Sequence, residues 1–151
     1  MKEKYMKMAL KEAEKAYKLG EVPIGAVIVK DNKIISRAYN NKQATNNPCG
    51  HAEILAIQKA CRKLNDWRLE DCDMYVTLEP CMMCAGTIIQ SRMRKIYIGT
   101  LDLKTGAIVS KMKSFDDFVF NHKMQYETGI LNEECEKILK DFFIELRKQV
   151  K

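Results

Sequence analysis

The hydrophobic and polar positions of the chain change their period several times, and each change indicates a new element. Residues 5–19 carry apolar side chains at helical spacing between lysines and glutamates, which predicts an amphipathic helix that ends at Gly20. Two β-branched runs, IGAVIVK and KIISRAY, flank Asp31 and Asn32 and predict a β-hairpin. The polar, asparagine-rich residues 40–50 predict a loop before the next helix.

The remainder of the chain alternates between helical and strand patterns. Helices are expected at 51–64, 81–91 and 131–150, strands at 73–78, 94–100 and 123–129, and a loop with short helical pieces at 101–123. Strands separated by helices imply a partly parallel sheet covered on both faces. We therefore predict an α/β fold, with a mixed five-stranded sheet between two helical layers, in one domain over residues 1–151.

Composition narrows the class of protein. The chain has 151 residues, 46% of them apolar and 30% charged, which is enough to build a core and argues against disorder. No apolar run is long enough for a signal peptide or a membrane span, so we expect a cytoplasmic protein with no membrane partner. The formal charge of +6 fits either an ordinary basic surface or a polyanionic partner such as RNA or DNA, and charge alone does not decide between them.

Two of the six cysteines, Cys81 and Cys84, form a C-x-x-C pair that opens a predicted helix. Residues three apart lie on one helix face, and a helix N-terminus favours thiolates. Alone, the pair could also be a buried or redox pair. His51 opens another predicted helix, and with the two thiolates it would give one Zn²⁺ three protein ligands. Three ligands leave a position for water, whose pKa zinc lowers towards neutrality.

Glu53 lies two residues beyond His51 and supplies a carboxylate next to this water. Such a carboxylate can take a proton from the water, pass it to a ring nitrogen and help an amine to leave as ammonia. The combined pattern H-x-E…P-C-x-x-C is a signature of zinc deaminases. We therefore predict one zinc ion per chain, Glu53 as the catalytic residue, and hydrolytic deamination of a nucleobase.

The sequence resembles the bacterial tRNA-specific adenosine deaminases of the cytidine-deaminase-like superfamily over nearly its whole length. The segments that carry the resemblance include EVPIGAVIV, HAEILA, YVTLEPCMMCAG, DLKTGA and FFIELR. The resemblance implies a three-layer α-β-α cytidine-deaminase-like fold. It also implies a homodimer that converts adenosine to inosine at the wobble position of a tRNA anticodon, which makes the anticodon stem-loop the expected partner.

The resemblance further implies substrate-binding roles for six residues. Asn40 would bind the adenine ring, Val22 would line the base pocket, Asp102 and Lys104 would touch flanking nucleotides, and Phe143 and Arg147 would contact RNA at the mouth. Ordinary structural roles compete with three of these. Asn40 also suits a turn, Lys104 a solvated loop, and Phe143 a hydrophobic core.

One loop departs from the family pattern. The family usually has D-P-T-A before H-A-E, whereas this chain has Asn47, Pro48, Cys49 and Gly50. A glycine in place of alanine is expected to loosen the approach to His51, and Cys49 could come near the metal. How this loop packs against the substrate is left open by the sequence.

Two other functions compete with the prediction. A deaminase of a free nucleobase or nucleoside, of the guanine or cytosine type, would share the metal site and Glu53. The charge of +6 and the D-x-K-T-G-A and F-F-x-x-L-R segments favour RNA instead. A non-catalytic RNA-binding subunit would not need Glu53, because this residue has little structural use beside an open metal position.

Overall fold

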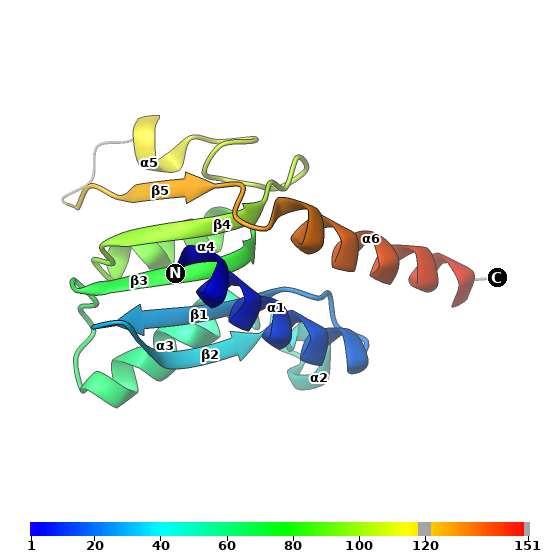
Figure 1. Ribbon diagram of the computed structural model, residues 1–151, viewed down its shortest axis with the longest axis horizontal. Coiled ribbons are helices and arrows are strands. Elements are labelled where there is room, and N and C mark those ends of the chain that lie inside the picture. The colour runs from blue at the N-terminus through cyan, green and yellow to red at the C-terminus, as the bar shows by residue number, and fades with distance from the viewer. Residues whose placement is uncertain (118–121, 150–151) are drawn as a thin grey trace.

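The computed structural model describes residues 1–117 and 122–149 (Figure 1). Its strands are β1 (Gly25–Lys30), β2 (Lys33–Tyr39), β3 (Cys72–Leu78), β4 (Lys95–Thr100) and β5 (Gln125–Thr128). Its helices are α1 (Lys2–Lys18), α2 (Lys42–Thr45), α3 (Ala52–Leu64), α4 (Met82–Gln90), α5 (Ser114–Asp117) and α6 (Asn132–Gln149). The parts of the predicted 101–123 loop and 131–150 helix that cover residues 118–121 and 150 lie outside the described residues.

The five strands form one mixed sheet in the order β2-β1-β3-β4-β5. Strand β1 pairs antiparallel with β2 and β3, whereas the β3–β4 and β4–β5 pairs are parallel. The predicted hairpin is confirmed. Asp31 and Asn32 have φ of 50° and 61°, the left-handed conformation that a tight hairpin turn requires and that aspartate and asparagine tolerate.

Helices cover both faces of this sheet. Figure 1 shows α1 and α6 on one face and α3 and α4 on the other. Successive side chains of β1 alternate between the two layers, as expected of a strand buried on both sides. Ala26 and Ile28 pack into the core under α3 and α4, whereas Val27 and Val29 pack into the core under α1. The predicted three-layer α/β fold is therefore confirmed.

The structure differs from the sequence prediction mainly in short elements. Helix α1 begins at Lys2 rather than at residue 5, and the predicted loop over 40–50 contains the one-turn helix α2. A single turn has too few residues for its period to show in a sequence. Helix α5 is a short helical piece of the kind expected within 101–123. Within the two described ranges, no helix is long and apolar enough to cross a membrane.

The strand directions bring several chain segments to one edge of the sheet. Because β3 and β4 are parallel, their carboxyl ends lie together, with Leu78 opposite Thr100. The Glu79 N–H then donates to the Thr100 carbonyl at 2.9 Å, which keeps the segments that follow the two strands side by side. Helices α3 and α4 both begin at this edge, where sites in α/β proteins form.

Candidate metal centre and active site

Two helix starts present the three predicted metal ligands. His51 is the N-cap residue of α3, Cys81 is the N-cap residue of α4, and Cys84 lies in the first turn of α4. Both N-cap residues have extended backbones, and neither side chain makes the usual capping hydrogen bond. Asn40 accepts a hydrogen bond from the α3 start instead, from Ala52 N–H to Asn40 Oδ1 at 2.8 Å. The His51 and Cys81 side chains are thus left to face each other.

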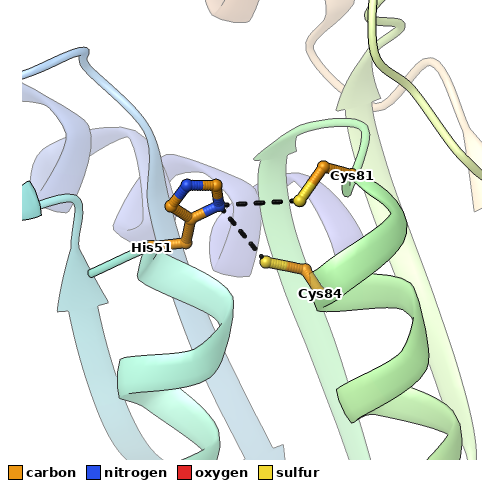
Figure 2. Close-up of side chains that lie close together, drawn as sticks. All are labelled: His51, Cys81 and Cys84. Carbon is orange, nitrogen blue, oxygen red and sulfur yellow. Dashed lines mark hydrogen bonds between the residues drawn. The ribbon is translucent and has the colours of Figure 1, made fainter. Parts of the chain in front are cut away.

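The three side chains converge on one point (Figure 2). The potential ligand atoms of His51, Cys81 and Cys84 all lie within 4.8 Å of one another. His51 Nδ1 lies 3.7 Å from Cys81 Sγ and 3.4 Å from Cys84 Sγ. A tetrahedral zinc ion, with Zn–N near 2.0 Å and Zn–S near 2.3 Å, separates such atoms by about 3.5 Å. The arrangement therefore fits a metal ion bound through Nδ1 and two thiolates.

Hydrogen bonds within the triad shift the pKa values of its three members in different directions. A hydrogen bond with Cys84 and, more weakly, one with His51 lower the pKa of Cys81 to about 4, against the effect of burial. Hydrogen bonding with Cys81 and burial raise the pKa of Cys84, and the Cys81 contact raises the pKa of His51. One thiolate is thus already favoured by the fold, and a divalent cation would stabilise the second.

Glu53 lies buried beside the triad, in the first turn of α3. Its Oε1 is a buried side-chain oxygen with no hydrogen-bond partner among the described residues. Desolvation by burial raises the pKa of the carboxyl group to about 7, despite the opposing effect of His51. An unpartnered buried oxygen is costly for a fold and points to a role in binding or proton transfer.

A cavity of about 870 Å³ opens at this edge of the sheet. It is large enough for a nucleoside and has an apolar lining with a few polar groups, as small-molecule sites commonly do. Its wall comes from the 20–24 segment, the starts of α2 and α3, the segments after β3 and β4, and α6. The lining residues include Val22, Asn40, His51, Glu53, Cys81, Leu101, Asp102, Leu103, Lys104, Phe142, Phe143 and Leu146.

Most of the residues predicted to bind substrate line this cavity. Asn40 is buried, with its Oδ1 occupied by the Ala52 N–H. Phe143 is 40% exposed whereas Phe142 is 7% exposed, so Phe142 belongs to the core and Phe143 is accessible at the surface. Arg147 is exposed near the end of α6 and does not line the cavity.

Asp102 and Lys104 lie at the mouth of the cavity, and their surroundings differ. Asp102 Oδ1 accepts the backbone N–H groups of Lys104 and Thr105 at 3.0 and 3.1 Å, and its Oδ2 accepts the Thr105 hydroxyl at 2.7 Å. The Asp102 carboxylate therefore orders its own loop. The Lys104 side chain is exposed and makes no ion pair within the described part of the chain.

The loop that departs from the family pattern is packed rather than loose. The Asn41 N–H donates to the Gly50 carbonyl at 3.0 Å, and the Gly50 N–H donates to the Asn47 carbonyl at 2.9 Å. A Cβ atom at position 50 would lie 2.6 Å from Asn41 Oδ1 and 3.0 Å from Lys42 Cα. Gly50 thus permits a close backbone approach, and the expected loosening is wrong. Cys49 is exposed and outside the metal triad.

Two buried carboxylates at the cavity, Glu21 and Glu79, are not among the predicted site residues, and each is 2% exposed. Both accept backbone N–H groups from segments more than 20 residues away in sequence. Burial alone would raise the pKa of Glu79. The hydrogen bonds that Glu79 accepts, of which the one from the Ser110 hydroxyl has the largest effect, hold this pKa below its usual value. The available signals were an acidic residue at the end of a buried strand, in Leu78-Glu79-Pro80, and another directly before Val22.

Comparison with known proteins places this fold and site in a class of enzymes. A family model of the MafB19-like deaminases matches residues 1–147. Within that class, the tRNA-specific adenosine deaminase of Bacillus subtilis (strain 168) is 48% identical over 149 residues, covering 99% of this chain and 92% of the relative. The one from Aquifex aeolicus (strain VF5) is 45% identical, with 99% and 98% coverage. The chain therefore belongs to the family of tRNA-specific adenosine deaminases.

Solved structures agree with this assignment. A structure from studies of A-to-I editing by tRNA:A34 deaminases at the wobble position of transfer RNA superposes with a TM-score of 0.87 and 41% identity. It covers 89% of this chain and 98% of its own. The guanine deaminase from Bacillus subtilis reaches a TM-score of 0.64 and 31% identity, with 97% and 93% coverage. The free-base rival thus shares the fold but is the more distant relative of the two.

Proposed function

We propose that this chain hydrolyses adenosine to inosine at the wobble position of a tRNA anticodon. We further propose that it uses one zinc ion held by His51, Cys81 and Cys84. One observation carries the chemistry: His51 Nδ1 faces two sulfur atoms at 3.4 and 3.7 Å, close to the spacing of a tetrahedral zinc site. The choice of adenosine in tRNA rests on the family to which the chain belongs.

The chain's own residues account for the proton movements of the reaction. When bound, zinc supplies Lewis-acid activation of a water molecule. Glu53 Oε1, which has no other partner among the described residues, accepts a proton from this water. Glu53 then donates that proton to the purine ring as the water oxygen bonds to C6. Glu53 then takes the remaining proton from the new C6 hydroxyl and donates it to the exocyclic amine. The bond between C6 and this amine breaks, so that adenosine and water give inosine and ammonia.

Asn40 and Val22 are proposed to hold the base. Because the Ala52 N–H fixes Asn40 Oδ1, the amide is oriented with Nδ2 as its remaining polar group, and Nδ2 makes no hydrogen bond with the described residues. Nδ2 can therefore donate to a ring nitrogen of the adenine. Val22 lines the same cavity and offers an apolar surface to the base.

The rim residues are proposed to contact the RNA around the target base. A paired and stacked adenine could not enter the cavity, so the target must be unpaired, as in an anticodon loop. Lys104 and Phe143 at the mouth and Arg147 further along α6 would then meet flanking nucleotides. A tRNA substrate would place the enzyme in the cytoplasm, and this location stays a prediction.

A homodimer is a further part of the proposal that the resemblance supports. The first helical residue of α4, Met82, is 66% exposed beside the metal centre and is a candidate for the interface. Light scattering on the purified protein should give twice the mass of one chain. A monomer that is fully active would remove the homodimer from the proposal.

Substrate choice can be tested directly. The zinc-loaded protein should release ammonia from a minimal anticodon stem-loop containing the wobble adenosine, and mapping should place inosine at that position. Free adenosine, guanine and cytidine should react far more slowly. Turnover of a free base with none on the stem-loop would overturn the proposed function.

A further inference from the structure

The Glu79 carboxylate is surrounded by hydrogen-bond donors from a single distant segment. Its Oε1 accepts the Asp102 N–H at 3.0 Å and the Ser110 hydroxyl at 2.5 Å. Its Oε2 accepts three successive N–H groups, those of Ile108, Val109 and Ser110, at 3.0, 2.8 and 3.0 Å. All five donors lie within residues 102–110, more than 20 positions beyond Glu79 in the chain.

This arrangement fixes the conformation of the 102–110 segment. Glu79 is 2% exposed and forms no ion pair among the described residues, so only these donors offset the cost of its burial. Any shift of the segment would leave a buried carboxylate with unmet acceptors. Gly106 shows how closely they fit, because a Cβ atom there would collide with the Glu79 carboxylate.

The same contacts connect the metal centre to the mouth of the cavity. Glu79 lies two residues before Cys81, and it holds the Asp102 N–H. The Asp102 carboxylate in turn holds the N–H groups of Lys104 and Thr105. Leu103, between Asp102 and Lys104 in the chain, is 73% exposed at the cavity mouth and offers an apolar surface to a base. The positions of Leu103 and Lys104 relative to the metal ligands are thus set through Glu79.

We propose that Glu79 is a positioning residue that fixes residues 101–105 relative to the metal centre and thereby determines which nucleotides are accepted next to the target base. The inference rests on the proposed function. The metal ligands and Glu53 lie at the reacting end of the cavity, whereas Leu103 and Lys104 lie at its mouth, where the chain of a nucleic acid would leave. Glu79 therefore acts on the choice of flanking nucleotides, through this segment, and does not touch the substrate.

A second buried carboxylate offers a matched control on another part of the wall. Glu21 Oε1 and Oε2 accept the N–H groups of Gln43 and Ala44, at 3.0 and 2.6 Å, at the start of α2. Glu21 is as buried as Glu79, and its loss would likewise leave backbone donors unmet. Because α2 lies apart from residues 101–105 in the chain and carries its own lining residues, the two carboxylates should affect different substrate positions.

The test compares Glu79→Gln with the unaltered protein on anticodon stem-loops that vary at the two positions flanking the wobble adenosine. A carboxamide has one acceptor oxygen, so if it serves residues 108–110, its NH₂ group opposes the Asp102 N–H. We expect the preference for the best flanking nucleotides to fall by about tenfold, the effect of losing a hydrogen bond to a charged group. The change should appear mainly in KM, and zinc per chain should stay the same.

Two further variants keep the test decisive if Glu79→Gln folds poorly. Ser110→Ala removes only one of the five donors and should relax the flanking preference in the same direction, by less. Glu21→Gln should leave unchanged the flanking-nucleotide preference that Glu79→Gln relaxes. Equal loss of rate on every stem-loop, or loss of zinc, would overturn the inference. Failure of the proposed function would look different, because the unaltered protein would then not react with any stem-loop.

Discussion

The metal centre and the mouth of the cavity are built in contrasting ways. At the metal centre, His51, Cys81 and Cys84 occupy helix starts, so the local chain direction brings the ligands together. At the mouth, residues 101–105 and α2 are short segments held by the distant carboxylates of Glu79 and Glu21. The metal ligands are thus placed by regular secondary structure, whereas residues 101–105 and α2 are held in place by hydrogen bonds to carboxylates that lie far away in the chain. The two regions should therefore respond differently to substitution.

Removal of a metal ligand should have the largest effect on activity. Cys81→Ala should lose the zinc ion and lower activity by more than about 10⁴-fold, because the metal's contribution to the reaction disappears. It should also lower the melting temperature, since metal binding stabilises the folded state. Zinc per chain, ammonia release and thermal melting measure the three effects. Cys49→Ala is the matched control, because Cys49 is exposed and outside the triad.

Glu53→Ala separates proton transfer from metal binding. We expect the rate to fall by about 10²–10⁴-fold, the usual contribution of a general acid–base, with zinc content and stem-loop binding retained. Removing a buried oxygen that has no hydrogen-bond partner among the described residues should also leave the protein at least as stable. Loss of zinc from this variant would show that Glu53 supports the metal, and unchanged activity would remove it from the mechanism.

Lys104→Ala addresses the mouth of the cavity. Loss of one cation at a single-stranded phosphate should reduce the slope of log binding constant against log salt by about 0.7. The binding constant of an anticodon stem-loop, measured over a series of salt concentrations, checks this. Lys63→Ala serves as the control, because Lys63 is exposed at the end of α3 that lies away from the metal centre. Equal salt slopes for Lys104→Ala and the unaltered protein would place the RNA elsewhere.

Gly50→Ala should have the smallest effect and tests the loop before His51. The added methyl group meets Asn41 Oδ1 and Lys42 Cα, so we expect a loss of stability of about 1–3 kcal/mol in denaturant unfolding. Gly86→Ala is a useful contrast, because no atom outside its own stretch of helix lies within 4 Å of its Cβ position and alanine favours a helix. An unchanged unfolding free energy for Gly50→Ala would mean that the loop can shift without cost.

The sequence predicted most of what is local. The periodicity gave the longer helices, all five strands and the mixed sheet, and the two short motifs gave the metal triad together with Glu53. Each helix and strand repeats its period over several residues, and each of the two motifs is short, so a sequence pattern can record them even though His51 and Cys81 are 30 positions apart. The one-turn helix α2 was missed because a single turn shows no period, and because the N–H groups of Gln43 and Ala44 bond to Glu21, a residue outside it.

The environments of individual cavity residues could not be predicted in the same way. The segment D-x-K-T-G does not predict that the Asp102 carboxylate accepts hydrogen bonds from Lys104 and Thr105, since these bonds depend on how the loop folds. The role of Glu79 depends on donors 23 to 31 residues away. The expectation that Gly50 loosens its loop was wrong for a related reason. The atoms that leave no room for a side chain at position 50 belong to Asn41 and Lys42, which come close only in the folded loop.

The hydrogen bond between Asn40 and the Ala52 N–H has a consequence for redesign of the enzyme. Asn40, proposed to hold the base, also secures the backbone directly after His51. Under this proposal, a substitution of Asn40 would change the contact with the base and the start of α3 together, so a library that varies Asn40 should contain few active members. The Val22 side chain lines the same cavity and cannot form a hydrogen bond, which makes Val22 the better starting point for directed evolution of base choice.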